Sequence, residues 1–521
     1  MTADVQPKVK INKIEKAKAA KDGLAVKDEL EQFAKVGWEN VDKTDLELRL
    51  KWLGLFFRPV TPGKFMLRMR MPNGNMTAHK MRVLAEIVER YGEEGSADIT
   101  TRQNVQLRGV RLEDAPDIFQ KLKDADMTSM QSGMDNVRNI TGSPVAGIDP
   151  EELIDTREML RKLQDAIVNN GEGNAAFSNL PRKFNIAVEG SRDNSIHAEL
   201  NDIAFIPAYR DGQLGFNIVV GGYLSAQRCA EAIPMGAWIP ATTEDVMAVS
   251  LGILTVYVAS GLTEGLRQTR SKARLMWLVE KWGTEKFRAE IEKEIGKPLA
   301  PAAPTDEIDR DKLDHLGVHD QKQEGFVYVG MHVPAGRLSA EAMFEISRLA
   351  EVYGNGEIRL TVEQNVIIPY IARENLDAFL TEPLLEQFKL APSTLSRSVV
   401  SCTGNRYCNF AMVETKGRAV EIAAQLDKEL DIPQRVRMHW TGCPNSCGQP
   451  QAGDIGLMGT KVRKDGKSLE GVNIYTGGKV GKDAHLGTLA QKGVACDDEL
   501  PEVLKQILIE QFGATPKSSA S

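Results

Sequence analysis

Residues 63–92 read GKFMLRMRMPNGNMTAHKMRVLAEIVERYG, and residues 325–354 read GFVYVGMHVPAGRLSAEAMFEISRLAEVYG. Both stretches carry a Pro-x-Gly turn and a final Tyr-Gly pair, and these features lie 262 positions apart. In each copy an alternating strand pattern runs up to the turn, an amphipathic helix follows, and a second strand begins after the Tyr-Gly pair. The sequence therefore predicts a strand-helix-strand unit that occurs twice.

The similarity between the two halves continues beyond this unit. FNIVVGGYLS (216–225) resembles VNIYTGGKVG (472–481), and each half adds more mixed helix and strand pattern. We expect an α+β protein with duplicated halves and pseudo-two-fold symmetry. The predicted parts are an N-terminal extension (1–50), a first repeat module (51–125), a mixed module (126–296), a linker (297–324), a second repeat module (325–395) and a second mixed module (396–521).

The charge and the apolar runs of the sequence argue against a nucleic-acid-binding protein and a membrane protein. The 521 residues include 65 Lys and Arg against 72 Asp and Glu, for a net charge of -7, so no global positive field attracts nucleic acid. The longest apolar run, AVSLGILTVYVASGL (248–262), is too short to cross a membrane and is predicted as a buried helix. The N-terminus lacks the features of a signal or transit peptide. We expect a cytoplasmic, monomeric protein of bacterial type, with the cyanobacterial type as one candidate, and with no membrane contact.

Four of the six cysteines fall in one stretch, as SCTGNRYC (401–408) and TGCPNSC (441–447). Zinc usually takes cysteine pairs two to four residues apart, and the five-residue gap of the first pair lies outside that range, whereas iron-sulfur clusters accept varied spacings. A metal cluster is therefore favoured, with structural zinc or four buried free thiols as alternatives. Cys229 and Cys496 have no partners and are predicted to be small buried residues.

The second cysteine pair resembles the signature of a known family. Thr441-Gly442-Cys443-x3-Cys447-x6-Asp454-Ile455-Gly456-Leu457 is similar, position by position, to the motif of the nitrite and sulfite reductases that contain sirohaem and a [4Fe-4S] cluster. The resemblance implies a duplicated fold with two ferredoxin-like modules and two mixed α/β sirohaem-binding modules. It also implies that all four cysteines, Cys402, Cys408, Cys443 and Cys447, ligate the cluster, and that Cys447 is in addition the axial ligand of the sirohaem iron.

The same resemblance assigns the catalytic residues. Arg68, Arg138 and Lys183 match the cationic groups that hold the oxyanion in this family. Sulfite-reducing members read Arg-Lys-Phe-Lys where this chain reads RKFN (182–185), so Asn185 replaces a lysine. Because nitrite carries a single negative charge, a pocket with one cation fewer avoids an uncompensated buried charge. Nitrite is therefore the expected substrate, with sulfite as the alternative.

The carboxylates of sirohaem need further cations. RQTRSKAR (267–274) places arginines at helical spacing, which predicts one cationic helix face, with a solvated face as the alternative. In the second repeat Glu363 stands where the first has Arg102, so only one functional centre is expected. The sirohaem contacts implied by the resemblance and this spacing are Arg102, Gln106, Arg182, Arg270, Lys272, Arg274, Asn445 and Cys447.

The resemblance implies an oxidoreductase. The expected reaction is the six-electron reduction of nitrite to ammonium in nitrate assimilation, and the alternative is the reduction of sulfite to sulfide. No nicotinamide, flavin or P-loop motif is present, so the electrons come from a partner, by resemblance reduced ferredoxin. An acidic ferredoxin would dock on a basic patch, for which residues 80–90 and 267–288 are the candidates.

Overall fold

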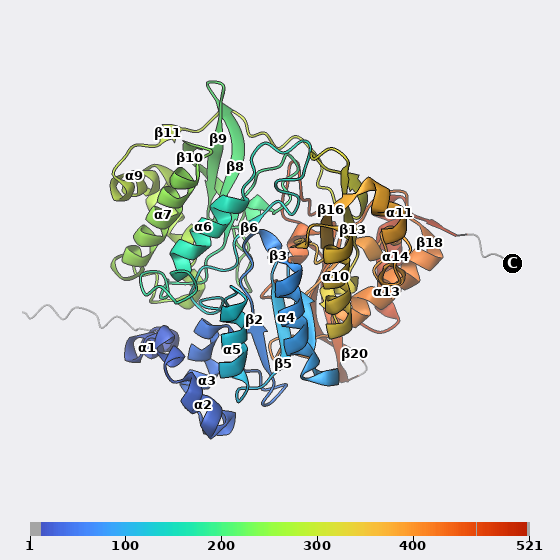
Figure 1. Cartoon of the computed structure of the whole chain (residues 1–521), viewed down its shortest axis with the longest axis horizontal. Helices are drawn as coiled ribbons and strands as arrows, with labels where there is room; N and C mark the ends of the chain where they lie inside the picture. The colour runs from blue at the N-terminus through green and yellow to red at the C-terminus, as the bar shows by residue number, and fades with distance from the viewer. Residues whose placement is uncertain (1–11, 465, 518–521) are drawn as a thin grey trace, which may run out of the picture.

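The computed structural model describes residues 12–464 and 466–517 (Figure 1). The first eleven residues of the predicted N-terminal extension and the last four of the chain lie outside the described residues. Helices and strands alternate along the chain. The strands of the described residues form two antiparallel sheets, from the repeat units, two mixed sheets, and a two-stranded antiparallel sheet of β18 (Leu430–Asp431) and β23 (Thr515–Pro516). The predicted α+β class is confirmed.

Each repeat unit folds as predicted. The first contains β2 (Phe65–Arg68), α4 (Ala78–Glu89) and β4 (Ser96–Ile99), and β5 (Val105–Val110) completes the hairpin. The second contains the corresponding elements, which are β13 (Phe326–Met331), α10 (Ala340–Tyr353), β15 (Glu357–Leu360) and β16 (Val366–Ala372).

The two repeats exchange short edge strands, which the sequence did not predict. β3 (Asn75–Thr77) follows the first Pro-x-Gly turn and pairs with β15 in the sheet of the second repeat. β14 (Arg337–Leu338) follows the second turn and pairs with β4 in the sheet of the first. The strand orders are β1-β2-β5-β4-β14, where β1 is Leu55–Phe56, and β12-β13-β16-β15-β3, where β12 is Gly317–Asp320.

The backbones pack closely where the repeats exchange edge strands, and this explains why each Pro-x-Gly turn contains a glycine. Gly74 has φ +65°, and a Cβ there would lie 2.5 Å from the carbonyl oxygen of Leu360. Gly336 has φ +70°, and a Cβ there would lie 2.9 Å from the carbonyl oxygen of Ile99. Only glycine adopts this conformation without strain while the two backbones touch. The turns thus join the halves as well as reversing the chain.

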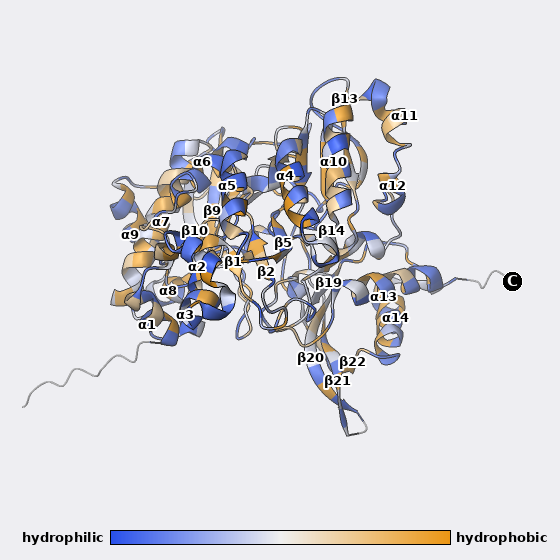
Figure 2. Ribbon diagram, turned by 60° about the horizontal axis from the view of Figure 1, so that its bottom comes forward, coloured by the Kyte–Doolittle hydropathy of each residue, from blue (hydrophilic) through white to orange (hydrophobic). Residues whose placement is uncertain are grey.

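One hydrophobic core serves both repeat modules. α4 and α10 pack side by side (Figures 1 and 2), and buried residues of each, such as Leu84 and Leu349, belong to the same core cluster. Burying the apolar faces of both helices against each other removes from water the surface that each module would expose alone. The duplicated halves therefore form a single packed unit.

The two mixed sheets repeat one topology. The first runs β11-β10-β9-β8-β7-β6, with β6 to β8 parallel, and the second runs β17-β19-β20-β21-β22, with β17 to β20 parallel. The predicted internal similarity falls on equivalent antiparallel strands, β9 (Gln213–Val220) and β21 (Lys467–Thr476). The remaining bounds are β6 (Thr141–Gly142), β7 (Ile186–Val188), β8 (Ile203–Arg210), β10 (Ile233–Pro240), β11 (Ala300–Pro301), β17 (Val399–Ser401), β19 (Met438–Thr441), β20 (Ile455–Lys464) and β22 (Thr488–Ala495).

Helices cover each mixed sheet. α6 (Arg157–Val168), α7 (Thr243–Thr263), α8 (Leu275–Trp282) and α9 (Thr284–Ile295) belong to the first, and α13 (Lys416–Glu429) and α14 (Glu499–Phe512) to the second. By length and composition α7 could cross a membrane, but 56% of that window is buried inside the protein, as predicted for a core helix. The hairpin of β20 and β21 projects away from α13 and α14, and its end is hydrophilic (Figure 2).

The stretch predicted as a linker, 297–324, contacts both halves. It contributes β11 to the edge of the first mixed sheet and β12 to the edge of the second repeat sheet. Between these strands, the Lys312 side chain is buried, and its Nζ lies 2.9 Å from Oε1 of Glu363. The segment therefore packs along the molecule.

Candidate functional site

Parallel strands bring the two cysteine pairs together. Cys402 directly follows β17, and Cys443 comes two residues after β19. These strands are parallel neighbours, so their carboxyl ends meet at one edge of the sheet. The backbone N–H of Gly442 donates to Sγ of Cys402 at 3.1 Å, and the N–H of Cys402 donates to the carbonyl of Trp440 at 3.0 Å. The fold thus places the pairs side by side.

The loop that carries Cys447 is tightly constrained. Ser446 and Gln449 have φ values of 55° and 56°, a left-handed conformation uncommon for residues other than glycine. A Cβ on Gly448 would lie 1.9 Å from the carbonyl oxygen of Trp440, so the loop rests directly on β19. From the first half, the Thr101 hydroxyl donates to the Cys447 carbonyl at 3.2 Å. The loop conformation is therefore fixed from both halves of the chain.

Electrostatics suit these thiols to a metal cluster. Burial, followed by the neighbouring thiols of which Cys447 acts most strongly, raises the pKa of Cys443 to about 12. Such thiols become thiolates only when positive charge, such as that of iron, lies beside them. Within the described residues, no three His, Cys, Asp or Glu side chains form a group suited to a single metal ion. Four thiols from two loops at one sheet edge are the donor type that a [4Fe-4S] cluster takes.

Cys229 and Cys496 differ slightly from the prediction. Both are half-buried rather than buried. Cys229 lies in the loop after β9, where its thiol contacts the Ser225 carbonyl at 3.8 Å, and Cys496 directly follows the end of β22. Each position is partly open because it lies in or next to a connecting segment, not in a strand interior.

A group of half-buried cations lies within electrostatic range of Cys447. Burial lowers the pKa of Arg68 to about 9 and that of Lys183 well below the usual lysine value, and the charge of Arg102 adds to both shifts. A thiolate at Cys447 opposes the shift in all three residues. The main causes of these shifts are burial and neighbouring cations, and no carboxylate is among them. Cations withdrawn from water without a partner charge are costly, so the pocket suits an anion.

Arg68 and Arg138 converge on one backbone carbonyl. Nη1 of Arg68 donates to the Ser132 carbonyl at 3.2 Å, and Nη1 of Arg138 donates to the same oxygen at 2.7 Å. Nε of Arg68 and Oδ1 of Asn185 are buried without a hydrogen-bond partner in the protein. Orphaned polar atoms of this kind indicate that a bound group completes the site. The anionic macrocycle and oxyanion implied by the resemblance fit these residues.

Asn185 is fixed through its backbone. Its N–H donates to Oδ2 of Asp202 at 2.8 Å, and Phe184 before it accepts from the Arg138 N–H at 2.8 Å. The RKFN segment and the Arg138 segment are thus paired at the start of β7. Of the four residues predicted to be catalytic, the structure directly links Arg68 with Arg138, and it brings Lys183 within electrostatic range of Arg102 and Cys447.

The prediction of one cationic helix face over 267–274 is wrong. α7 ends at Thr263, Gly265 takes φ +74° and interrupts the helical conformation, and α8 begins only at Leu275. The arginines consequently point to different partners. Arg270 forms a bidentate pair with Asp135, at 2.8 Å for both contacts, whereas Nε of Arg274 donates to Asp202 at 3.0 Å.

The remaining predicted sirohaem contacts lie at different places. Nη2 of Arg108 donates to Oε1 of Gln106 at 3.0 Å, and Nη1 of Arg182 lies 3.8 Å from Asp135. Asn445 is exposed within the second cysteine loop. Nζ of Lys272 lies 5.4 Å from the centre of the Trp277 ring, and no described contact connects it to the cations around Cys447.

One cation near the cysteines was not predicted. The pKa of Arg58 is lowered by burial, and the charges of Cys408 and Cys447 act against that shift. Its guanidinium also lies 5.8 Å from the ring centre of Phe410, an exposed residue just after Cys408. Nothing in the sequence singles out Arg58, because a lone arginine before a proline is usually a surface residue.

In the second repeat, an internal ion pair occupies the position equivalent to Arg102. Glu363 corresponds to Arg102, and it pairs with Lys312 at 2.9 Å and lies 3.9 Å from Nε2 of His197. This internal ion pair explains the change of charge noted in the sequence. It also supports the expectation of a single functional centre.

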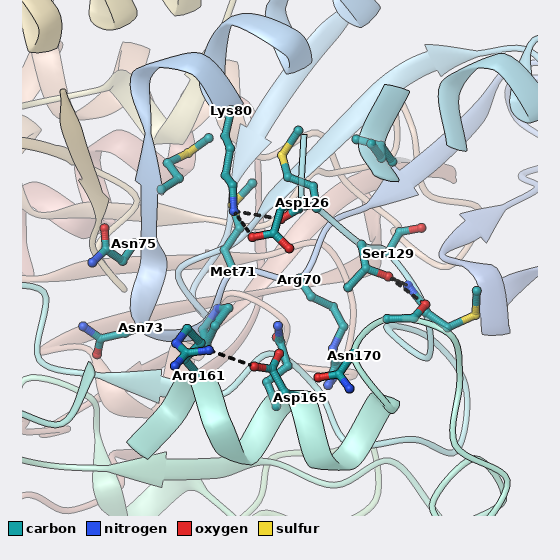
Figure 3. A pocket seen from close by; sticks show the side chains of 18 of the residues that line it. Arg70, Met71, Asn73, Asn75, Lys80, Asp126, Ser129, Arg161, Asp165 and Asn170 are labelled. Atoms are coloured by element: carbon teal, nitrogen blue, oxygen red, sulfur yellow. Dashed lines mark hydrogen bonds and ion pairs between the residues drawn. The ribbon is translucent and has the colours of Figure 1, made fainter. Parts of the chain in front are cut away.

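The cavity of Figure 3, about 1020 Å³, lies apart from the predicted site residues, none of which lines it. Its wall contains charged residues that are already paired, for example Lys80 with Asp126 at 3.1 Å and Arg161 with Asp165 at 3.2 Å. Arg70 connects it to the site, since this residue lines the cavity and Nη1 donates to the Val137 carbonyl at 2.9 Å. The cavity itself offers no cysteine.

Comparisons with known proteins agree with this geometry. Residues 133–299 and 394–513 match the nitrite and sulphite reductase 4Fe-4S domain, and residues 59–125 and 319–385 match the nitrite/sulfite reductase ferredoxin-like half domain. The chain is 60% identical to a ferredoxin–nitrite reductase of Leptolyngbya laminosa, over 99% of this chain and 100% of that one. It is 58% identical to that of Synechococcus elongatus, over 98% of both chains.

A solved structure extends the agreement to the fold. The NirA protein of Mycobacterium tuberculosis superposes with a TM-score of 0.86 at 29% identity, covering 98% of this chain and 95% of that chain. The family matches fall on the two repeat modules and the two mixed modules, including all four clustered cysteines. The chain therefore belongs to the family of nitrite and sulfite reductases.

Proposed function

We propose that this protein is a ferredoxin-dependent nitrite reductase that converts nitrite to ammonium. The observation that carries the proposal is the group of half-buried cations within electrostatic range of Cys447, together with the neutral Asn185. The names of the relatives, at 58–60% identity over nearly whole chains, support it. The reaction consumes nitrite, six electrons and eight protons, and yields ammonium and two waters.

Both cofactors are assigned to residues of this chain. Cys402, Cys408, Cys443 and Cys447 would hold the [4Fe-4S] cluster, and Cys447 would also bind the sirohaem iron. Arg102, Arg182 and Arg274 would face the carboxylates of the macrocycle. When bound, the two coupled groups supply single electrons and an iron that takes up the substrate.

The chain's own residues orient the substrate and move protons. Arg68 and Arg138 are held in register because both donate to the Ser132 carbonyl, and their remaining N–H groups would bind the nitrite oxygens. Lys183 has a lowered pKa because of burial, so its ammonium gives up a proton more readily than an exposed lysine. Asn185 would orient the anion through a hydrogen bond without adding charge.

Turnover of the purified protein tests this function. With reduced ferredoxin, or with dithionite and viologen, we expect nitrite to be converted to ammonium at one ammonium per nitrite. The absorption spectrum should contain the bands of sirohaem. Sulfite turnover that equals or exceeds nitrite turnover would overturn the assignment in favour of sulfite reduction.

Asn185→Lys should shift specificity toward sulfite. The added ammonium would compensate a dianion but would leave excess positive charge beside nitrite. We expect the ratio of kcat/KM for sulfite to that for nitrite to rise about tenfold, equivalent to about 1.4 kcal/mol. Asn185→Gln, which stays neutral, is the matched control. An unchanged ratio in Asn185→Lys would remove Asn185 from the specificity argument.

The ferredoxin-docking surface can also be proposed from the structure, beside the candidates 80–90 and 267–288 from the sequence. Arginines of the 80–90 candidate are already paired, for example Arg82 of α4 with Glu351, and Arg90, just after α4, with Asp117. We propose the face of β20 that carries Lys461 and Arg463, both exposed, on the projecting hairpin (Figure 2).

Contacts link this face to the cysteines. Lys461 lies directly opposite Glu470 on β21, so their side chains share one face of the hairpin. Oε1 of Glu470 accepts from Nδ2 of Asn405 at 2.7 Å, and Asn405 lies in the loop between Cys402 and Cys408. A partner bound on this face would therefore sit close to the cluster.

Charge reversal on the hairpin tests the docking proposal. Lys461→Glu with Arg463→Glu should raise the KM for ferredoxin by at least about fivefold at low ionic strength, because both substitutions repel an acidic partner. Turnover with dithionite and viologen should not change. The matched control is Lys13→Glu with Lys16→Glu, two exposed lysines of helix α1 (Lys13–Ala20). An equal loss with both donors would contradict a docking role.

A cytoplasmic location and a monomeric state stay predictions from the sequence.

A further inference from the structure

The N-terminal helix reaches the group of cations. α1 places the Lys18 side chain in the interior, where it is 3% exposed. Its Nζ donates to Oδ2 of Asp135 and to the carbonyl oxygen of Leu180, both at 3.0 Å, and lies 2.5 Å from Oε1 of Glu15. The first part of the chain, assigned no role from the sequence, thus contacts two segments of the site.

Asp135 is the acidic centre of this arrangement. Its side chain is fully buried and accepts hydrogen bonds from both terminal nitrogens of Arg270, each at 2.8 Å. Nη1 of Arg182 is 3.8 Å from Oδ1, too far for a hydrogen bond. Burial disfavours the carboxylate, but Arg270, Lys18 and Arg182 outweigh it and lower the pKa of Asp135 to about 2. Asp135 is therefore ionised at neutral pH, and three cations lie beside its carboxylate.

The Leu180 carbonyl lies at the start of the segment that carries the site. Leu180 precedes Arg182 and Lys183 by two and three residues, and its N–H donates to the Asp135 carbonyl at 2.9 Å. Arg267 supports the same segment by donating to the carbonyl of Asn179 at 2.6 Å. It also pairs with Glu15 of α1 at 2.9 Å. Two side chains of α1, Lys18 and Glu15, thus hold the segment from outside.

We propose that Lys18 is a positioning residue for the anion pocket, because it occupies Asp135 and so leaves Arg182 free to face the bound anions. The inference rests on the proposed function for the identity of those anions. Without Lys18, Oδ2 of Asp135 keeps the Arg270 donor but loses its second one, and Arg182, whose Nη1 lies 3.8 Å from Oδ1, is the cation placed to approach the carboxylate. That movement would withdraw one positive charge from the pocket.

Lys18→Met is the direct test in the holoenzyme. The dissociation constant of nitrite, titrated through the sirohaem absorption, should rise about tenfold, equivalent to about 1.4 kcal/mol. The kcat at saturating nitrite should change less than about twofold, since a uniform loss of binding leaves kcat unchanged. Lys16→Met, on the exposed face of the same helix, should behave as the parent, and Lys18→Arg should restore affinity.

The double variant separates positioning from a general loss of structure. In an Asp135→Asn background the anion that attracts Arg182 is gone, so Lys18→Met should then add no further loss of nitrite affinity. An equal loss in both backgrounds would overturn the proposal, as would a fall in kcat with unchanged affinity. If Lys18→Met does not fold, Lys18→Gln, which keeps a donor but removes the charge, carries the same test.

Crystal structures of the variants test this inference independently of the proposed function. In Lys18→Met the distance from Arg182 Nη1 to Asp135 should shorten from 3.8 Å to hydrogen-bond length. An unmoved Arg182 would refute the inference even in an active enzyme. A parent protein that does not reduce nitrite would refute the proposed function, and the position of Arg182 would still decide the role of Lys18.

Discussion

Cys447→Ser should abolish nitrite reduction, with a fall in kcat of at least about a thousandfold, because groups that act as a unit in catalysis lose nearly all their effect when one is removed. In the proposed site this sulfur serves both the cluster and the sirohaem iron. A serine hydroxyl is a harder and far less acidic ligand than a thiol and does not replace it. Both the sirohaem absorption and the iron content per chain should fall together.

The chain supplies its own controls for this experiment. Cys229→Ser and Cys496→Ser remove half-buried thiols that lie outside the cysteine loops, and both should leave the spectrum and kcat unchanged. Cys408→Ser should lose the cluster as well, which tests the four-ligand assignment separately from the bridge. Full sirohaem absorption and near-normal turnover in Cys447→Ser would remove this residue from the centre.

Much of the architecture could be predicted because short stretches of the sequence determine it. The Pro-x-Gly turns and the amphipathic helices are short-range signals, and each occurs twice, as does the sequence Gln-Asn-Val at 103–105 and 364–366. The exchange of β3 and β14 between the repeats could not be predicted in this way. Those strands are two or three residues long and are defined by partners far away in the chain, such as β15 for β3.

The functional site also has residues that local sequence predicts and residues that it does not. The cysteines stand in a spaced motif, and parallel neighbours β17 and β19 bring the two pairs together as that motif implies. The arginines of 267–274 were assigned to one helix face by spacing alone, and the turn at Gly265 disperses them. Lys18 carries no sequence signal, because its role depends on Asp135, which lies 117 residues away along the chain. Long-range ion pairs are set by the tertiary fold.

Lys183 combines a charge with a proton, and two substitutions can separate these roles. Lys183→Met removes both, so kcat/KM should fall by about 10² to 10⁴, the range expected for loss of a positioned general acid. Lys183→Arg keeps the charge but not a transferable proton, since guanidinium stays protonated in proteins. We therefore expect Lys183→Arg to retain most of the nitrite affinity while losing kcat. Steady-state kinetics with dithionite and viologen measures both parameters without ferredoxin docking.

The pH profile decides whether the proton matters. Burial, and then the charge of Arg274, lower the pKa of Lys183 well below the usual lysine value. A general acid works only while protonated, so kcat of the parent should fall as pH rises through this lowered pKa, well below the pH at which an exposed lysine titrates. The fall should be absent in Lys183→Arg, which stays charged over the same range. If the parent and Lys183→Arg lose kcat at the same pH, another group supplies the proton, and Lys183 contributes charge alone.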